Sequence, residues 1–352
     1  MEKLVHISPT MPPAVNGLGD FCSLLANNMQ RKGYKDNVFF LRFYDFENTL
    51  ESEIVKFTPE NFYENLLKHK PSAIILHYVG YGYNAKGLPF YLVRGLEEYK
   101  KKEKCKVLVY FHELYSSSTN PLQLPFYTNF LQKRIVKKLY SIADITFTNC
   151  ELYQELLYDL TPVEENKNFC TGMCSNIPEH MYDPSMEKEE STMLVFGSFE
   201  RRNAVYQNLV FKKLMERLGI ENIYDIGPGK PSLNHSEINF YSKGPLTAKE
   251  VAFYLNKAKY GAIDYPPHLL GKSGIFSAYC GFGVIPINTS QEKKPLYDGL
   301  IEGKNYFNPD TDFENVMTDY KRVKKEISAW YKLRDQNTIA NSFIKQLEIC
   351  GE

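Results

Sequence analysis

The sequence lacks a charge imbalance. Its 42 lysines and arginines match its 42 aspartates and glutamates, so the formal net charge is +0 at pH 7. A chain without surplus positive charge creates no long-range field that would attract a polyanion. We therefore expect no nucleic-acid partner.

The sequence also lacks a long hydrophobic run. No apolar stretch approaches the roughly 20 residues that a membrane-spanning helix needs. The first ten residues, MEKLVHISPT, lack the basic start, apolar run and cleavage site of a signal peptide. We expect a cytoplasmic protein.

Cysteine patterns typical of metal sites are absent too. Seven cysteines are present, and Cys170 and Cys174 form the closest pair. No second pair of cysteines or histidines follows with the spacing of a zinc site. We expect reduced, mostly buried thiols and no bound metal.

What is present is an alternation of apolar runs and helical patterns. With 352 residues, of which 43% are hydrophobic, the chain is long enough for two domains with buried cores. Continuous apolar strands separated by helices predict parallel sheets covered on both faces. The expected strands of the first half are 3–8, 37–43, 72–79, 106–113 and 143–150, and a helix is expected over 19–33.

A second alternation follows a proline-containing, charged segment. Residues 174–192 have no apolar period and are typical of an interdomain linker. Strands are expected from 193–199 onward, with one helix over 204–219 and a long helical tail over roughly 311–349. The pattern predicts two α/β domains with a cleft between them, which is the default place for a ligand.

Two familiar glycine motifs are excluded by their spacing. A Walker A loop would need a glycine where Pro266 stands, five residues before Gly271. The stretch PAVNGLGDF contains Gly17 and Gly19 but has Cys22 where a dinucleotide-binding motif needs its third glycine. Neither an NTPase nor a dehydrogenase is favoured.

A third glycine pattern favours an anion site. The segment GKSG starts a helix, where free backbone N–H groups and the helix dipole attract negative charge. Gly271 and Gly274 allow close approach, Ser273 adds a hydroxyl, and Lys272 adds a charge. The alternative is an ordinary helix start with a solvated lysine.

The stretch VFGSFERRN repeats this arrangement after an expected strand. Arg201 and Arg202 follow Gly197 in a loop, and arginines at a strand end can bind phosphate oxygens. Two solvated arginines are the alternative. If Arg201 and Arg202 do bind phosphate, they and Lys272 together would suit a diphosphate.

With these segments, the sequence resembles glycosyltransferases that have two Rossmann-like domains (the GT-B type), most closely glycosyltransferase family 4. The resemblance extends over nearly the whole chain, in the stretches NGLGDF, VYFHE, CSNIPEHMYDP, SFERRN, YSKGPLTAKEVAFYLNKAKYGAIDYPP and GKSGIFSAYCGFGVIPI. It implies an acceptor-binding domain over 1–175, a linker over 176–192, a nucleotide-sugar-binding domain over 193–330 and a C-terminal helix, 331–352, that packs back on the first domain.

The resemblance also implies an activity and a set of site residues. The activity is transfer of a hexosyl group with retention of configuration, from a UDP- or GDP-linked sugar to a glycan or lipid-linked acceptor, in polysaccharide or glycoconjugate synthesis. No cofactor or metal takes part. The implied catalytic residues are His112, Arg202 and Lys272, and the implied donor-binding residues are Gly17, Gly19, Arg201, Pro245, Leu246, Gly271, Ser273, Gly274 and Ile275.

The sequence departs from that family at one pair of positions. Two glutamates eight residues apart are common around this phosphate loop, and here His268 and Phe276 stand in their places. The second glutamate normally binds the ribose. A catalytically inactive scaffold or partner subunit is therefore the alternative function, and an epimerase with the same architecture is a further one.

A basic helical segment has two interpretations. In FLQKRIVKKLY, Lys133, Arg134, Lys137 and Lys138 alternate with apolar residues. Such a helix could rest on the inner face of an anionic membrane, where a lipid-linked acceptor would lie. The alternative is an ordinary crossover helix with one buried face and one wet face.

Overall fold

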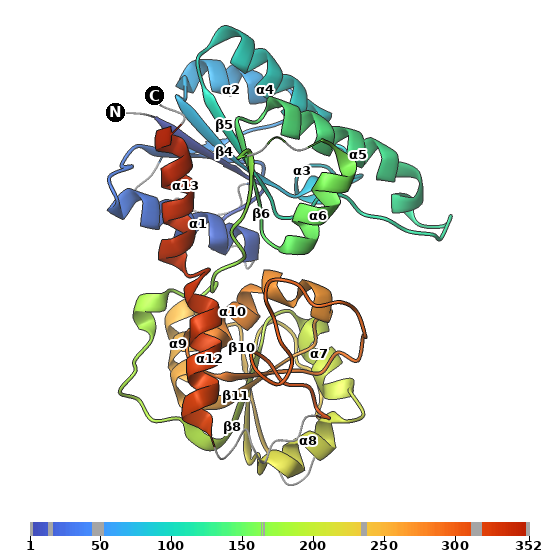
Figure 1. Cartoon of the computed structure of the whole chain (residues 1–352), viewed down its shortest axis with the longest axis vertical. Helices are drawn as coiled ribbons and strands as arrows, with labels where there is room; N and C mark the ends of the chain where they lie inside the picture. The colour runs from blue at the N-terminus through green and yellow to red at the C-terminus, as the bar shows by residue number, and fades with distance from the viewer. Residues whose placement is uncertain are drawn as a thin grey trace. The chain divides into compact units, whose positions relative to one another are not determined.

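The computed structural model describes residues 3–12, 17–43, 53–162, 164, 166–233, 238–310 and 319–349. The chain forms two compact units. The first comprises Met1–Gly172 and Ile339–Glu352, and the second comprises Met173–Thr338 (Figure 1).

The first unit contains a parallel sheet with the strand order β3-β2-β1-β4-β5-β6-β7. Its strands are β1 (Leu4–Ser8), β2 (Asn37–Leu41), β3 (Glu53–Lys56), β4 (Ala73–Tyr78), β5 (Lys106–Phe111), β6 (Ile145–Thr148) and β7 (Asn168–Cys170). Its helices are α1 (Gly17–Arg31), α2 (Phe62–His69), α3 (Gly80–Tyr83), α4 (Phe90–Lys102), α5 (Leu124–Ile142), α6 (Glu151–Leu160) and most of α13 (Gln336–Ile349).

The second unit contains a parallel sheet with the strand order β10-β9-β8-β11-β12. Its strands are β8 (Glu189–Phe196), β9 (Asn222–Ile226), β10 (Asn239–Gly244), β11 (Ala258–Ile263) and β12 (Ile285–Asn288). Its helices are η1 (Glu179–Met181), α7 (Phe199–Gln207), α8 (Phe211–Leu218), α9 (Ala248–Lys257), η2 (Pro267–Lys272), α10 (Gly274–Gly281) and α12 (Tyr320–Lys332).

The two faces of each central strand lie in different surroundings because side chains alternate along a strand. In β1, Val5 and Ile7 join the large core of the first unit. His6 points to the opposite face, where its ring stacks on Phe39 at 5.3 Å. Helix α1 covers this second face, since its Cys22 packs with Phe39 in one buried cluster.

The predicted α/β class with two Rossmann-like domains is confirmed by these sheets and helices. The prediction of a single helix over 204–219 is wrong. Asn208 ends α7, because its side chain accepts a hydrogen bond from the N–H of Val210 (3.1 Å) and donates one to the carbonyl of Thr289 (2.7 Å).

The expected helical tail is interrupted as well. Helices α12 and α13 are separated by residues 333–335, where Asp335 accepts a hydrogen bond from the N–H of Thr338 at 2.7 Å. Residues 311–318, which the same prediction included, lie outside the described residues. Among the helices that the structure describes, none combines the length and apolar character needed to cross a membrane.

Candidate functional site

The candidate anion site lies in the second unit, at the carboxyl ends of its strands. Strand β8 leads into Gly197 (φ 128°), and β9 leads into Gly227 (φ 146°). A Cβ on Gly197 would lie 2.6 Å from the Cδ1 of Ile275. Glycine at 197 therefore lets the turn after β8 approach the start of helix α10.

Arg202 lies in the first turns of α7 and is fully buried, with an exposed fraction of 0%. It forms an ion pair with Asp225, which is equally buried. Its Nε donates to the carbonyl of Gly197 (3.0 Å), and its Nη2 donates to the carbonyls of Pro228 and Gly229. These partners make Arg202 a clamp that fixes the ends of β8 and β9.

The adjacent residue, Arg201, has a different environment. Its side chain is exposed, and its Nη1 donates to the carbonyl of Asp264 at 3.2 Å. Its guanidinium lies over the ring of Tyr265, 4.5 Å from the centroid. Arg201 is thus held at the end of β11 with part of its guanidinium open to solvent.

The segment GKSG lies where the sequence predicts it, at the start of α10. Ser273 is the N-cap of that helix, and its Oγ accepts the N–H of Phe276 at 3.2 Å. Lys272 ends η2 and is partly exposed. Gly271 is required by packing, since a Cβ there would lie 2.7 Å from the Cγ of Asp298.

One small cavity brings both predicted segments together. It has a volume of about 40 Å³. Its lining includes Arg201, Arg202, Ser273 and Ile275, which the sequence singled out, and Asp264 and Tyr265, which it did not. Gly274 is the first residue of the same helix, and in the first turn its N–H and that of Ile275 have no acceptor within the helix.

Pro245 and Leu246 lie elsewhere along the same edge of the sheet. They follow β10 directly, and Thr247 then caps helix α9 with a reciprocal pair of hydrogen bonds to Glu250. Pro245 is exposed, and Leu246 packs against the core. Neither residue lines the 40 Å³ cavity.

His112 belongs to a buried row of histidines in the first unit. The Nδ1 of His77 lies 3.3 Å from the Nε2 of His112, and the Nε2 of His77 lies 3.4 Å from the Nδ1 of His6. The parallel register explains the row. His6 pairs with Ile75 and His77 with Tyr110, so each histidine is two residues nearer the carboxyl edge than the one before and all three share one face.

Burial controls the protonation of two of these side chains. It lowers the pKa of His6 to about 3. Burial first, and then the neighbouring His112 and His6, lower the pKa of His77 well below its usual value. His6 and His77 are therefore neutral at pH 7. Each neutral ring has one N–H donor and one acceptor nitrogen, so hydrogen bonds along the row can all run in one direction.

The glycine loop of the first unit begins helix α1. Gly17 has open space around the position of a Cβ, whereas a Cβ on Gly19 would lie 2.9 Å from the Cα of Met11. Gly19 therefore allows α1 to approach the turn after β1. Asp20 stands in the first turn of α1, where burial raises the pKa of its carboxyl to about 7.

One group among the described residues has the chemistry of a metal site. The donor atoms of His6, Cys22 and His77 all lie within 4.8 Å of one another. All three side chains are buried. The ligand types suit zinc, although burial raises the pKa of the Cys22 thiol and so opposes the thiolate that a metal needs.

Sequence reasoning missed several residues of the histidine row and of the candidate anion site. His6 lies in an apolar strand and carries no motif. Asp225 and Tyr265 are recognisable only once β9 and β11 lie next to β8, since no local spacing relates them to Arg201 or Arg202. Gly197, four residues before Arg201, was the sequence signal for the carboxyl edge of this sheet.

Comparisons with known proteins identify the fold. No model of a protein family matches the chain, and no curated protein matches it. Solved structures do match: the HepE protein of Anabaena in complex with UDP and glucose has a TM-score of 0.65 at 10% identity, covering 99% of this chain and 100% of that one.

Two further solved structures are similar over almost their whole lengths. A putative UDP-N-acetylglucosamine 2-epimerase from Listeria monocytogenes has a TM-score of 0.62 at 11% identity, covering 98% of this chain and 95% of that one. An alpha-glucosyltransferase in complex with UDP and DNA has a TM-score of 0.58 at 11% identity, and both chains are covered completely. The chain thus has the GT-B fold with its two Rossmann-like domains; membership of glycosyltransferase family 4 stays a prediction.

Proposed function

We propose that this protein is a glycosyltransferase that moves a sugar from a UDP-linked donor to a glycan or lipid-linked acceptor. The observation that carries the proposal is that Arg201 and the start of α10, with Ser273 and Ile275, line one cavity at an edge of the second sheet, and Lys272 directly precedes Ser273. Cations and free N–H groups at a helix start suit a diphosphate. Several solved structures with the same fold contain UDP.

The proposed chemistry needs no protein nucleophile. Lys272, Arg201 and the N–H groups of Gly274 and Ile275 would neutralise the charge that develops on the departing diphosphate. The acceptor hydroxyl would attack from the side that the diphosphate leaves, and a phosphate oxygen would take its proton, which retains configuration. His112 would position the sugar, and Arg202 would hold Gly197 and Gly229 in place.

The experiment has two readouts. UDP is expected to raise the melting temperature of the full chain, and a UDP-sugar is expected to be consumed when a panel of acceptors is supplied. Lys272→Ala should abolish most of the melting shift, whereas Lys213→Ala, an exposed lysine on α8, should not. If no nucleotide shifts the melting temperature, the proposal fails.

A second candidate function is favoured by one observation. Phe276, which stands where related enzymes commonly place a ribose-binding glutamate, is fully buried, and its ring packs edge-on against Trp330 at 5.1 Å. That position cannot bind a ribose. A nucleotide-binding scaffold without activity is therefore the alternative, and UDP binding without consumption of any UDP-sugar would support it.

An epimerase is distinguished by its product. The similarity to a putative UDP-N-acetylglucosamine 2-epimerase motivates this possibility. Incubating the protein with UDP-sugars and no acceptor would decide it, because an epimerase would release an altered sugar still joined to UDP, or the altered free sugar with UDP.

A further inference from the structure

An unusual number of apolar side chains are exposed where helix α5 begins. They are Leu122, Leu124, Phe126, Tyr127 and Phe130, and Leu122 and Phe130 have exposed fractions of 92% and 67%. The rings of Phe126 and Tyr127 contact each other at 5.1 Å. Five such residues within nine positions form an apolar patch, which monomeric proteins seldom leave open without a use.

The patch continues into a basic stripe on the same face of the helix. Residues four apart lie above one another on a helix, so Phe126, Phe130, Arg134 and Lys138 form one line. Arg134, Lys137 and Lys138 are exposed. Within the described part of the chain, these three cations form no ion pair with a carboxylate.

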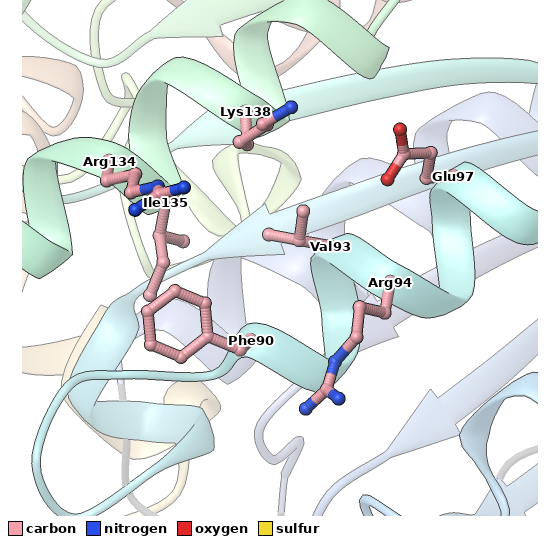
Figure 2. A pocket seen from close by; sticks show the side chains of 7 residues that line it. All are labelled: Phe90, Val93, Arg94, Glu97, Arg134, Ile135 and Lys138. Atoms are coloured by element: carbon pink, nitrogen blue, oxygen red, sulfur yellow. The ribbon is translucent and has the colours of Figure 1, made fainter.

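A groove lies beside this stripe, between α4 and α5. It has a volume of about 310 Å³. Figure 2 shows the apolar side chains of Phe90, Val93 and Ile135 between the two helices, with charged groups around them. The charged lining residues are Arg94, Arg134, Lys138 and Glu97.

The charge of this groove favours an anion. Three cations face one carboxylate, and Glu97 already has a partner in Lys101 at 3.7 Å. The groove thus offers arginine and lysine groups for phosphate oxygens above an apolar floor. That combination matches a phospholipid, whose headgroup is anionic and whose chains are apolar.

We propose that the face formed by the apolar patch, the basic stripe and this groove docks onto the surface of an anionic membrane. The aromatic and leucine side chains would enter the boundary between headgroups and acyl chains, and the groove would hold a lipid phosphate. A polynucleotide is disfavoured, because it would leave the apolar patch exposed and meets no surplus charge on the chain as a whole. This inference does not depend on the proposed transferase activity.

Vesicle co-sedimentation tests the inference with the full chain. Binding is expected to vesicles of phosphatidylcholine mixed with phosphatidylglycerol, and not to phosphatidylcholine alone. High salt should weaken it. Loss of three basic side chains near an anionic surface should lower the affinity by roughly a hundredfold, so the triple variant Arg94→Gln, Arg134→Gln, Lys138→Gln should fail to sediment.

The apolar patch and the basic groove are separated by matched variants. Phe126→Ser with Phe130→Ser should weaken binding while the salt dependence remains. Leu209→Ser with Lys213→Gln alters an apolar and a basic residue, both exposed, in the second unit and should sediment like the parent chain. Circular dichroism and thermal melting check that the variants of the first unit fold, and Trp330 fluorescence checks the control variant of the second unit.

Four outcomes would overturn the proposal. Equal binding to both vesicle types, or to neither, would exclude an anionic membrane. Binding to a short DNA duplex that is lost in the basic triple variant would assign the face to a polynucleotide. Displacement of the vesicles by inorganic phosphate at millimolar concentration, without a matching effect of chloride, would assign the groove to a free anion.

Discussion

Replacing Arg202 by alanine should destabilise the second unit by about 3–5 kcal/mol, the usual effect of removing one partner from a buried ion pair. The magnitude follows from the surroundings of the pair. Both side chains have an exposed fraction of 0%. Without the guanidinium, the carboxylate of Asp225 keeps two hydroxyl partners among the described residues, Tyr206 at 2.9 Å and Ser242 at 3.3 Å, and three carbonyls lose this donor.

The assay is urea unfolding followed by tryptophan fluorescence. The sequence contains one tryptophan, Trp330, which lies in the second unit and is buried there. Its emission therefore reports this unit alone. A domain is commonly stable by only about 5–15 kcal/mol, so the midpoint of the Arg202→Ala variant should move strongly toward lower urea.

Two further variants separate the ion pair from other effects. Arg201→Ala removes the adjacent, exposed arginine and should cost less than about 1 kcal/mol. Arg202→Met combined with Asp225→Leu removes both buried charges and should recover much of the loss. An Arg202→Ala protein as stable as the parent, but without affinity for UDP, would refute the clamp and make Arg202 a phosphate ligand.

Two further predictions concern the histidine row and the GKSG segment. The pKa of His6 is lowered in the folded state, so the unfolded chain binds the proton more tightly; stability should be complete above pH 6.5 and fall toward about pH 3. His6→Phe should reduce that slope by up to about 1.4 kcal/mol per pH unit in urea titrations at several pH values, and an unchanged slope would contradict it. Gly271→Ala should cost about 1–3 kcal/mol by clashing with Asp298, while Gly17→Ala, which meets no atom, should leave the unfolding midpoint nearly unchanged.

Much of the fold could be predicted from the sequence because the central strands are continuous apolar runs. The strands expected at 37–43, 72–79 and 106–113 contain β2, β4 and β5. The edge strands β3 and β7 were missed, since EIVK and NFC are too short to show a pattern. The break at Asn208 was missed because it depends on Thr289, which is distant in the sequence.

The candidate site was predictable only in part, for a physical reason. Glycines and cations mark the two segments, and Arg201, Arg202, Ser273 and Ile275 from these segments line one cavity; the binding of an anion there stays a prediction. Residue type alone cannot distinguish an arginine that meets a ligand from one that meets a buried aspartate. Arg201 and Arg202 are adjacent, and the pairing of β8 with β9 decides their different environments.

The central claim is that Lys272 and the start of α10 hold a diphosphate, and calorimetric titration with UDP tests it most directly. The account predicts that the parent chain and Lys213→Ala bind UDP alike, and that Lys272→Ala binds it about 10- to 100-fold more weakly, as expected for the loss of one charged hydrogen bond. Equal affinity of Lys272→Ala and the parent chain would contradict the claim.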